Sequence, residues 1–216
     1  MRRDLLKSGI AIAVGSTLSQ MGLNANAQSN GPQEGKHYFR VSPTVATNAP
    51  GKIEVVEFFW YGCPHCFSLE PLMQEWAKKL PADVAFRKEH VAFPQALKHQ
   101  QMFYTMRTLG VEPTTTNKIF EAIHKERKLL LTVAEQADLA AQLGIDKKKY
   151  TETFASFTVQ TMVKKSANLS NAFKIEGVPV FAVNGKYTTG PREAGGNGPA
   201  LEIVDLMIQK ERTLKK

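Results

Sequence analysis

The clearest hydrophobic pattern in the chain is a strand-length run followed by a helical stripe. Residues 53–59 are apolar on both faces except at Glu54 and Glu57, as in a strand inside a parallel or mixed sheet. After Gly62, apolar residues recur at spacings of three and four, which draws one buried stripe along a helix: Cys66, Leu69, Met73, Trp76 and Leu80. The pattern predicts a strand, a turn and a helix, and the turn carries the only two cysteines of the chain.

A second strand is expected directly after this helix. The helix is predicted from residue 63 to about residue 79, with a bend at Pro71 and a stop at Pro81. Residues 84–93 then have the composition of a strand, and residues 37–41 predict a shorter strand upstream. A β-α-β unit joins two parallel strands by a right-handed crossover. The sequence therefore predicts a sheet that contains a parallel strand pair.

From residue 95 to about residue 174 the hydrophobic period is that of helices alone. Thr132 and Glu135 have the spacing of a capping box, and Asp146 is a suitable N-cap residue. These signals predict five helices, at residues 95–109, about 116–128, 133–143, 147–156 and 158–174.

The strand pattern returns after residue 177. Residues 178–183 and 186–189 flank the pair Asn184-Gly185, and Asn-Gly between apolar runs is the strongest short signal for a β-hairpin. A loop rich in glycine and proline follows at residues 190–199, and the apolar spacing from Ala200 onward predicts a final amphipathic helix. The predicted order is strand, helix, strand, helices, antiparallel hairpin and helix.

The candidate chemistry lies in the turn Cys63-Pro64-His65-Cys66. Pro64 suits the first helical position, so Cys63 caps the helix and Cys66 lies one turn in, on the core side. Residues three apart at a helix start are roughly 5–6 Å apart, which allows either a disulfide or a dithiol. Unpaired N–H groups and the helix dipole favour a thiolate on Cys63, and His65 adds positive charge or a hydrogen bond. Cys63 is the predicted reactive sulfur, and a stabilised thiolate makes its disulfide a strong oxidant.

The same turn, with four further segments, carries a family resemblance. The segments match at residues 56–59, 88–91, 177–179 and 183–187. On these residues the chain resembles the bacterial periplasmic DsbA-type thiol–disulfide oxidoreductases of the thioredoxin superfamily, over nearly the whole chain after residue 27. The resemblance implies an α/β protein with the thioredoxin fold, in which helices flank a central mixed sheet and an all-helical domain is inserted.

The resemblance also implies roles for residues outside the turn. Glu57, six residues before the first cysteine, and Lys88, on the next strand, are expected to help move protons to Cys66. A purely structural ion pair is the alternative. The family has a cis proline facing the disulfide, here Pro179, and Val178 would then offer backbone groups to an extended substrate. The residues alone also fit a proline that merely opens a strand.

Aromatic and histidine residues near the turn receive separate interpretations. Trp60, Tyr61, Phe67 and Phe93 are expected to line an apolar surface where unfolded chains dock. Structural roles are expected for the histidines outside the turn, which are His37, His90, His99 and His124. Because these histidines show no i, i+4 pairing and zinc would need two more ligands, the sequence favours redox chemistry over a metal site.

Residues 1–27 have the pattern of an export signal. A basic start and a mildly apolar stretch lead to Ala25-Asn26-Ala27, and Arg2-Arg3 fits either the twin-arginine or the general secretory route. We expect cleavage near Ala27 and a periplasmic location. The predicted domain boundaries are 28–94 for the first part of the thioredoxin-like domain, 95–174 for the helical insertion and 175–216 for the second part.

Composition changes this picture little. A chain of 216 residues with 43% hydrophobic residues suits one or two compact domains. The net charge is +8, of which +2 belongs to residues 1–27. The basic runs at 147–149 and 164–165 are interpreted as solvated helix faces, so no nucleic-acid partner is expected. We expect a monomer.

These features predict a dithiol–disulfide oxidase that donates the Cys63–Cys66 disulfide to reduced or unfolded exported proteins, through a mixed disulfide at Cys63. The resemblance implies reoxidation by a DsbB-type, quinone-linked partner in the inner membrane. No cofactor is expected, because the disulfide itself carries the electrons. Two alternatives stay open, which are a disulfide isomerase or reductase and a peptide-binding chaperone whose disulfide is only structural.

Overall fold

The computed structural model describes residues 31–214 of the 216-residue chain. The predicted export signal, residues 1–27, and its cleavage site lie outside the described residues. Within the described part, no helix has the length and apolar character needed to span a membrane.

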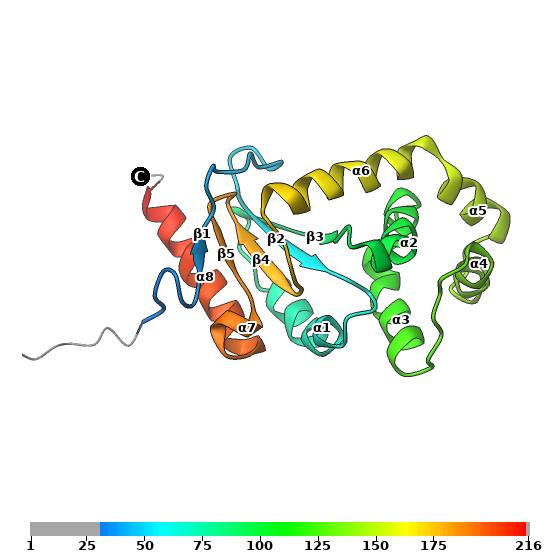
Figure 1. Ribbon diagram of the computed structural model, residues 1–216, viewed down its shortest axis with the longest axis horizontal. Coiled ribbons are helices and arrows are strands. Elements are labelled where there is room, and N and C mark those ends of the chain that lie inside the picture. The colour runs from blue at the N-terminus through cyan, green and yellow to red at the C-terminus, as the bar shows by residue number, and fades with distance from the viewer. Residues whose placement is uncertain (1–30, 215–216) are drawn as a thin grey trace, which may run out of the picture. The chain divides into compact units, whose positions relative to one another are not determined.

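The strands of the described residues form a mixed five-stranded sheet (Figure 1). Strand β2, Ile53–Phe59, pairs in parallel with β3, Val84–His90, as the sequence pattern predicted. On its other side β2 pairs antiparallel with β4, Val180–Val183. The order β1-β5-β4-β2-β3 is completed by β5, Tyr187–Thr189, and β1, Phe39–Arg40. The predicted thioredoxin fold is thereby confirmed.

Strand β2 lies inside the sheet, and all seven of its residues are buried. A strand covered on both faces needs apolar side chains on both, which accounts for its unbroken hydrophobic run. Glu57 is 0% exposed, and the strand register places it opposite Lys88 on β3 and Phe181 on β4. The one carboxylate in the middle of β2 therefore faces a cation on the neighbouring strand.

Helices cover both faces of the sheet (Figure 1). Helix α1, Pro64–Ala77, and helix α8, Asn197–Leu214, share a core with one face. That core includes Val55, Leu69, Phe181, Val204 and Ile208. The opposite face packs against Phe173, which follows helix α6, Phe157–Ala172. The apolar residues from which these strands and helices were predicted therefore lie in the core.

The segment between β3 and β4 carries only helices. After the 3₁₀ turn η1, Pro94–Ala96, the helices are α2 Leu97–Thr108, α3 Glu112–His124, α4 Val133–Gln142, α5 Lys147–Ala155 and then α6. The predicted caps are confirmed: Thr132 and Glu135 form a capping box, and Asp146 accepts from the Lys149 N–H. Helix α3 begins earlier than predicted, because Pro113 and Glu112 both suit a first helical turn.

The Asn184-Gly185 hairpin is confirmed, with φ values of 50° and 68° at the two turn residues. Strand β4 begins at Val180, later than predicted, since Pro179 has no N–H to give to the sheet. The loop predicted at residues 190–199 contains a short helix, α7, Pro191–Ala194. Four residues are too few to show a hydrophobic period.

Candidate active site

The Cys-Pro-His-Cys turn lies where β2 passes into α1. Cys63 is the N-cap residue of α1, and Pro64 follows it in the first helical turn, as predicted. The Cys63 N–H donates to the Trp60 carbonyl at 3.0 Å and closes the turn, while the Phe67 N–H donates to the Cys63 carbonyl at 3.1 Å. The reactive turn is therefore fixed at the positive end of a helix.

The two cysteines are free thiols with opposite electrostatic character. A hydrogen bond from the Cys66 side chain lowers the pKa of Cys63 to about 6, against burial, which raises it. The backbone N–H groups of Cys66 and His65 and the charge of His65 lower the pKa of Cys63 further. Burial instead raises the pKa of Cys66 well above its usual value, and its side chain is 0% exposed. The negative charge of the reduced pair therefore resides on Cys63.

Beneath the turn, Glu57 and Lys88 form the ion pair expected from the resemblance. Lys88 Nζ lies 2.7 Å from Glu57 Oε2. Burial raises the pKa of Glu57 to about 7, against the attraction of Lys88. Burial lowers the pKa of Lys88, but the carboxylates of Glu57 and Glu70 outweigh it and raise that pKa overall. The Glu57 charge in turn raises the pKa of Cys66, which couples the ion pair to the buried thiol.

Glu70 is a member of this cluster that the sequence interpretation missed. It is buried on α1, and its Oε2 accepts a hydrogen bond from Lys88 Nζ. Its Oε1 accepts from Gln74 at 3.0 Å, and Gln74 accepts from Asn117 on α3 at 2.9 Å. A signal existed, because Glu70 lies four residues after Cys66 and so on the same helix face. A carboxylate on the same helix face as the buried apolar residues indicates that a buried cation or hydrogen-bond donor lies nearby.

Val178 and Pro179 lie against the reactive sulfur. The Val178–Pro179 peptide bond is cis, as the resemblance implied, and a second cis bond, Ser42–Pro43, was not expected. The Cys63 thiol donates to the Val178 carbonyl across 3.5 Å. The backbone at Val178 is therefore within reach of any chain bonded to Cys63.

Three histidines hold the segment that precedes the turn. Trp60 Nε1 donates to His99 Nδ1 at 3.0 Å, and the Tyr61 N–H donates to His90 Nε2 at 3.3 Å. His124 Nε2 lies 2.8 Å from the Tyr61 carbonyl. Burial lowers the pKa of His90 to about 3, so its imidazole is neutral at neutral pH. These contacts give the three histidines the structural placement that was expected for them.

Tyr61 corrects the predicted apolar surface. Its side chain is 0% exposed, and its ring lies edge-on against Phe59, Phe103 and Phe120. Tyr61 is therefore core, because the helices that follow β3 cover it. Trp60, Phe67 and Phe93 are half-buried and keep part of their surface open.

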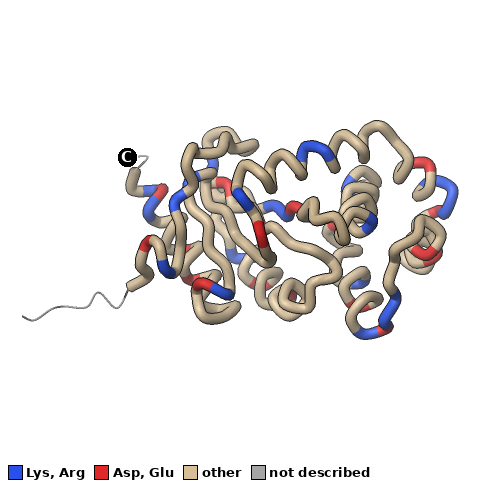
Figure 2. The backbone as a smooth tube through the Cα atoms, in the orientation of Figure 1, with Lys and Arg blue, Asp and Glu red and all other residues tan. Residues whose placement is uncertain are grey.

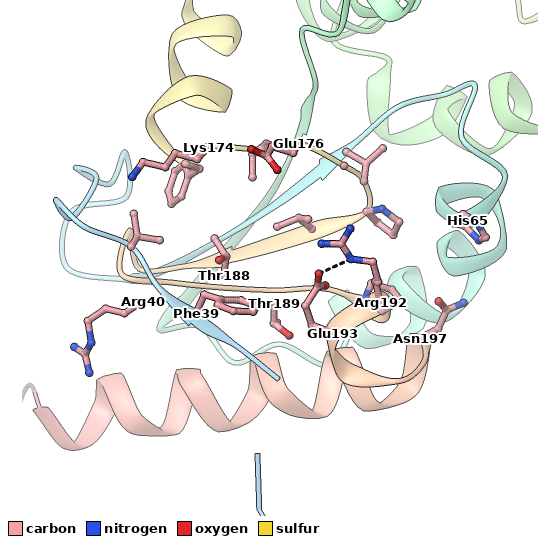
Figure 3. Close-up of a pocket in the computed structure, with 18 of the residues that line it drawn as sticks. Phe39, Arg40, His65, Lys174, Glu176, Thr188, Thr189, Arg192, Glu193 and Asn197 are labelled. Atoms are coloured by element: carbon pink, nitrogen blue, oxygen red, sulfur yellow. Dashed lines mark hydrogen bonds and ion pairs between the residues drawn. The ribbon is translucent and has the colours of Figure 1, made fainter. Parts of the chain in front are cut away.

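A groove of about 800 Å³ starts at the reactive turn. His65 lies at one end of the groove (Figure 3). Val178 and Pro179 also line it. The apolar lining also includes Phe39, Val41, Phe173 and Val180. Arg192 and Glu193 form an ion pair at 2.8 Å on its rim (Figure 3). The groove offers an apolar channel with charged edges beside Cys63.

The groups around the turn do not form a metal centre. Within residues 31–214, no three His, Cys, Asp or Glu side chains are placed to hold a metal ion. Lys and Arg residues lie on several helices with acidic residues between them (Figure 2). The chemistry of the site is that of a dithiol beside a buried ion pair.

Known proteins share both the sequence and the architecture. The DSBA-like thioredoxin domain family matches residues 73–195. The thiol:disulfide interchange protein DsbA of Pseudomonas aeruginosa is 44% identical over 191 residues, which covers 88% of this chain and 90% of that protein. DsbA of Azotobacter vinelandii is 42% identical over 205 residues, covering 94% of this chain and 96% of that one. The crystal structure of Pseudomonas aeruginosa DsbA aligns with a TM-score of 0.83 at 45% identity, over 86% of this chain and 97% of that chain.

Proposed function

Because this chain belongs to the DsbA family of thiol:disulfide interchange proteins and is a thiol–disulfide oxidoreductase, we propose that Cys63 is the sulfur through which it oxidises client proteins. The observation that carries the proposal is the asymmetry of the pair. Cys63 has a pKa of about 6 at a helix start, whereas Cys66 is wholly buried and its pKa is raised. Only Cys63 can both meet a client and leave as a stable thiolate.

The exchange proceeds in two steps. A client thiolate attacks Cys63 Sγ, the Cys63–Cys66 bond breaks, and its electron pair passes to Cys66, which takes up a proton. A second client thiolate then attacks the client sulfur of the mixed disulfide, which releases Cys63 as a thiolate and leaves a disulfide in the client. The client loses two electrons, and the enzyme leaves with both cysteines reduced.

The low pKa of Cys63 gives this exchange its direction. Each unit by which the Cys63 pKa falls below the ambient pH stabilises the reduced enzyme by about 1.4 kcal/mol, equivalent to about 30 mV of oxidising power. The N–H groups and the charge that lower this pKa act on the thiolate and not on the disulfide. The disulfide is therefore a strong oxidant.

Glu57 supplies a proton route for the buried thiol. Cys66 must gain a proton when the disulfide opens and lose it when the disulfide closes again. Glu57 has a pKa of about 7 and interacts electrostatically with Cys66. A group with a pKa near the working pH exchanges protons efficiently in both directions. Lys88 and Glu70 hold that carboxylate in the interior.

Clients bind as extended chain along the groove. The Val178 backbone lies beside Cys63 and can pair with a client strand by strand addition, which requires an unfolded segment. The apolar lining of the groove receives the side chains on either side of the client cysteine. Reduced or unfolded exported proteins therefore fit the site.

The cellular setting follows the family. The enzyme works in the periplasm after removal of residues 1–27, as a monomer. A DsbB-type, quinone-linked membrane partner reoxidises it, and Cys66 closes the disulfide in that step. The disulfide itself carries the electrons, so no separate cofactor takes part.

Two cysteine variants test the proposal. Cys63→Ser is expected to lose oxidation of a reduced client. Cys66→Ser, given a client that already contains a disulfide, is expected to accumulate a mixed disulfide: its Cys63 thiolate attacks the client disulfide and releases a client thiolate, and no Cys66 is present to resolve the product. Gel electrophoresis shows this product without reductant and its loss with reductant. Client oxidation at the wild-type rate by Cys63→Ser would instead indicate a peptide-binding chaperone. A redox titration of the wild type against glutathione separates oxidase from reductase, since a potential near the thioredoxin value of about −270 mV would contradict the oxidase.

A further inference from the structure

The Trp60 backbone touches both cysteines. Its carbonyl accepts from the Cys63 N–H at 3.0 Å and closes the turn. The Trp60 backbone also lowers the pKa of Cys66, against the burial that raises it. Trp60 is therefore joined to the turn by its own backbone.

The Trp60 indole is packed tightly against the turn. A Cβ at Gly62 would lie 2.5 Å from Cζ2 and 2.6 Å from Cε2 of the indole, so only glycine fits there. Gly62 is the residue directly before Cys63. The indole is therefore packed directly against the backbone that leads into the reactive cysteine.

His99 fixes the indole from α2. An indole N–H can only donate, so His99 Nδ1, 3.0 Å from Trp60 Nε1, carries no proton. His99 Nε2 then carries the proton and donates to the Leu129 carbonyl at 2.8 Å. His99 is 4% exposed and has a backbone partner on one side and Trp60 on the other. The geometry holds one neutral tautomer and one indole orientation.

We propose that His99 is a positioning residue for the thiol–disulfide exchange: by holding the Trp60 indole over Gly62, it keeps the turn in the geometry that stabilises the Cys63 thiolate. The proposal rests on the donor role of Cys63 given above and adds a residue thirty-six positions away in the chain. His99 touches neither sulfur and acts only through Trp60.

The effect is selective for the reduced enzyme. The backbone N–H groups of His65 and Cys66 stabilise a charge on Cys63, and that charge exists only after the disulfide opens. A turn held in place keeps these groups aimed at the sulfur, so it favours the reduced state over the disulfide. A contact that stabilised the reduced enzyme and the disulfide form equally would not shift the equilibrium between them. Loss of the His99 contact is therefore expected to weaken the oxidant as well as the fold.

A pair of variants tests the proposal. His99→Leu removes the acceptor, whereas His99→Asn, with a smaller side chain, keeps an acceptor oxygen near the place of Nδ1; both variants lose the bond to the Leu129 carbonyl. Thiolate absorbance against pH and equilibration with glutathione are measured on each variant, with His37→Leu as a control at a histidine that hydrogen-bonds to Gln33 and Thr189. His99→Leu is expected to lower the equilibrium constant for client oxidation about three- to tenfold and to raise the Cys63 pKa in step. His99→Asn and His37→Leu are expected to stay within about twofold of wild type.

Trp60→Phe completes a double-mutant cycle. Since His99 acts through the indole N–H, Trp60→Phe with His99→Leu is expected to lose no more than the worse single variant. Folded His99→Leu protein with an unchanged Cys63 titration would overturn the proposal, and so would equal losses in the Leu and Asn variants or additive losses in the cycle. A wild type with an ordinary Cys63 pKa would overturn the donor role itself, so the two failures are distinguishable.

Discussion

Two clusters of charged side chains lie on the same pair of strands and differ in their access to solvent. In one, Glu57 and Lys88 meet Glu70 beneath the cysteines, with side-chain exposures of 0%, 8% and 2%. In the other, Glu54 on β2 pairs with Arg87 on β3 at 3.1 Å, and the Arg87 side chain is 23% exposed. Alternation along the strands places the two clusters on opposite faces of the sheet.

The clusters also differ in hydrogen bonding. Glu54 Oε1 accepts from the Asn48 N–H at 3.0 Å and from Arg87 Nε at 3.1 Å. Among the described residues, neither Glu57 oxygen has a hydrogen-bond partner beyond its ion pair with Lys88. Glu57 therefore bears a large desolvation cost, which raises its pKa to about 7. The same residue types therefore occur once as a pair whose carboxylate keeps a backbone hydrogen bond and once as a pair whose carboxylate, within the described residues, has no partner beyond its lysine.

The largest effect on stability is expected from removing Lys88, the cation of the buried cluster that it forms with Glu57 and Glu70. Lys88→Met leaves two buried carboxylates without a counter-charge, so we expect a loss of about 3–5 kcal/mol in the free energy of unfolding at pH 7. Urea unfolding of the oxidised protein measures it. A loss under about 1 kcal/mol would show that water or another cation reaches Glu57.

A pH series sharpens the same comparison. Since the Glu57 pKa is raised above its unfolded value of about 4.3, the folded state holds this proton more tightly, and the associated stability is lost as pH rises toward and through 7. Glu57→Gln removes that dependence, so its stability relative to wild type is expected to increase by about 1–3 kcal/mol between pH 5 and pH 8. Glu54→Gln serves as the matched control for the loss of a buried carboxylate on the same strand.

The two glutamates are also expected to differ in catalysis. Glu57→Gln removes the group that exchanges a proton with Cys66, and we expect reoxidation of the reduced enzyme at pH 7 to slow by about tenfold or more. Stopped-flow tryptophan fluorescence during oxidation measures this rate. Equal reoxidation rates for Glu57→Gln, Glu54→Gln and wild type would show that Glu57 and Lys88 form only a structural ion pair.

The smallest effect is expected at the Glu54–Arg87 pair. Arg87→Met should cost less than Lys88→Met, about 1–3 kcal/mol, because Glu54, although its side chain is only 5% exposed, keeps the hydrogen bond from the Asn48 N–H. Urea unfolding beside Lys88→Met gives the direct contrast. A cost as large as that of Lys88→Met would mean that solvent access does not separate the clusters.

The sequence predicted those features that depend on local pattern. The bounds of β2 were correct because a strand buried on both faces is apolar throughout. The capping box at Thr132 and the Asn184-Gly185 hairpin were correct because each depends on a few neighbouring residues. The place of Cys63 at a helix start follows equally from Pro64 and the stripe behind it.

Features that depend on distant contacts were not predictable in this way. The burial of Tyr61 and the bond from Trp60 to His99 both depend on where α2 and α3 pack, and no local period encodes that packing. Glu70 was detectable by its helix face, but its partner Lys88 comes from β3. The cis bond at Pro179 was expected from family resemblance alone.

Only 6% of the Cys63 residue is open to solvent, with the Val178 carbonyl 3.5 Å from its sulfur. A thiol on the rounded surface of a finished domain cannot enter such a recess, whereas one on a slack, bendable stretch of chain can. If Cys63 is the donor proposed above, a client is expected to become a poorer substrate as it folds, because its cysteines then lose access to this recess.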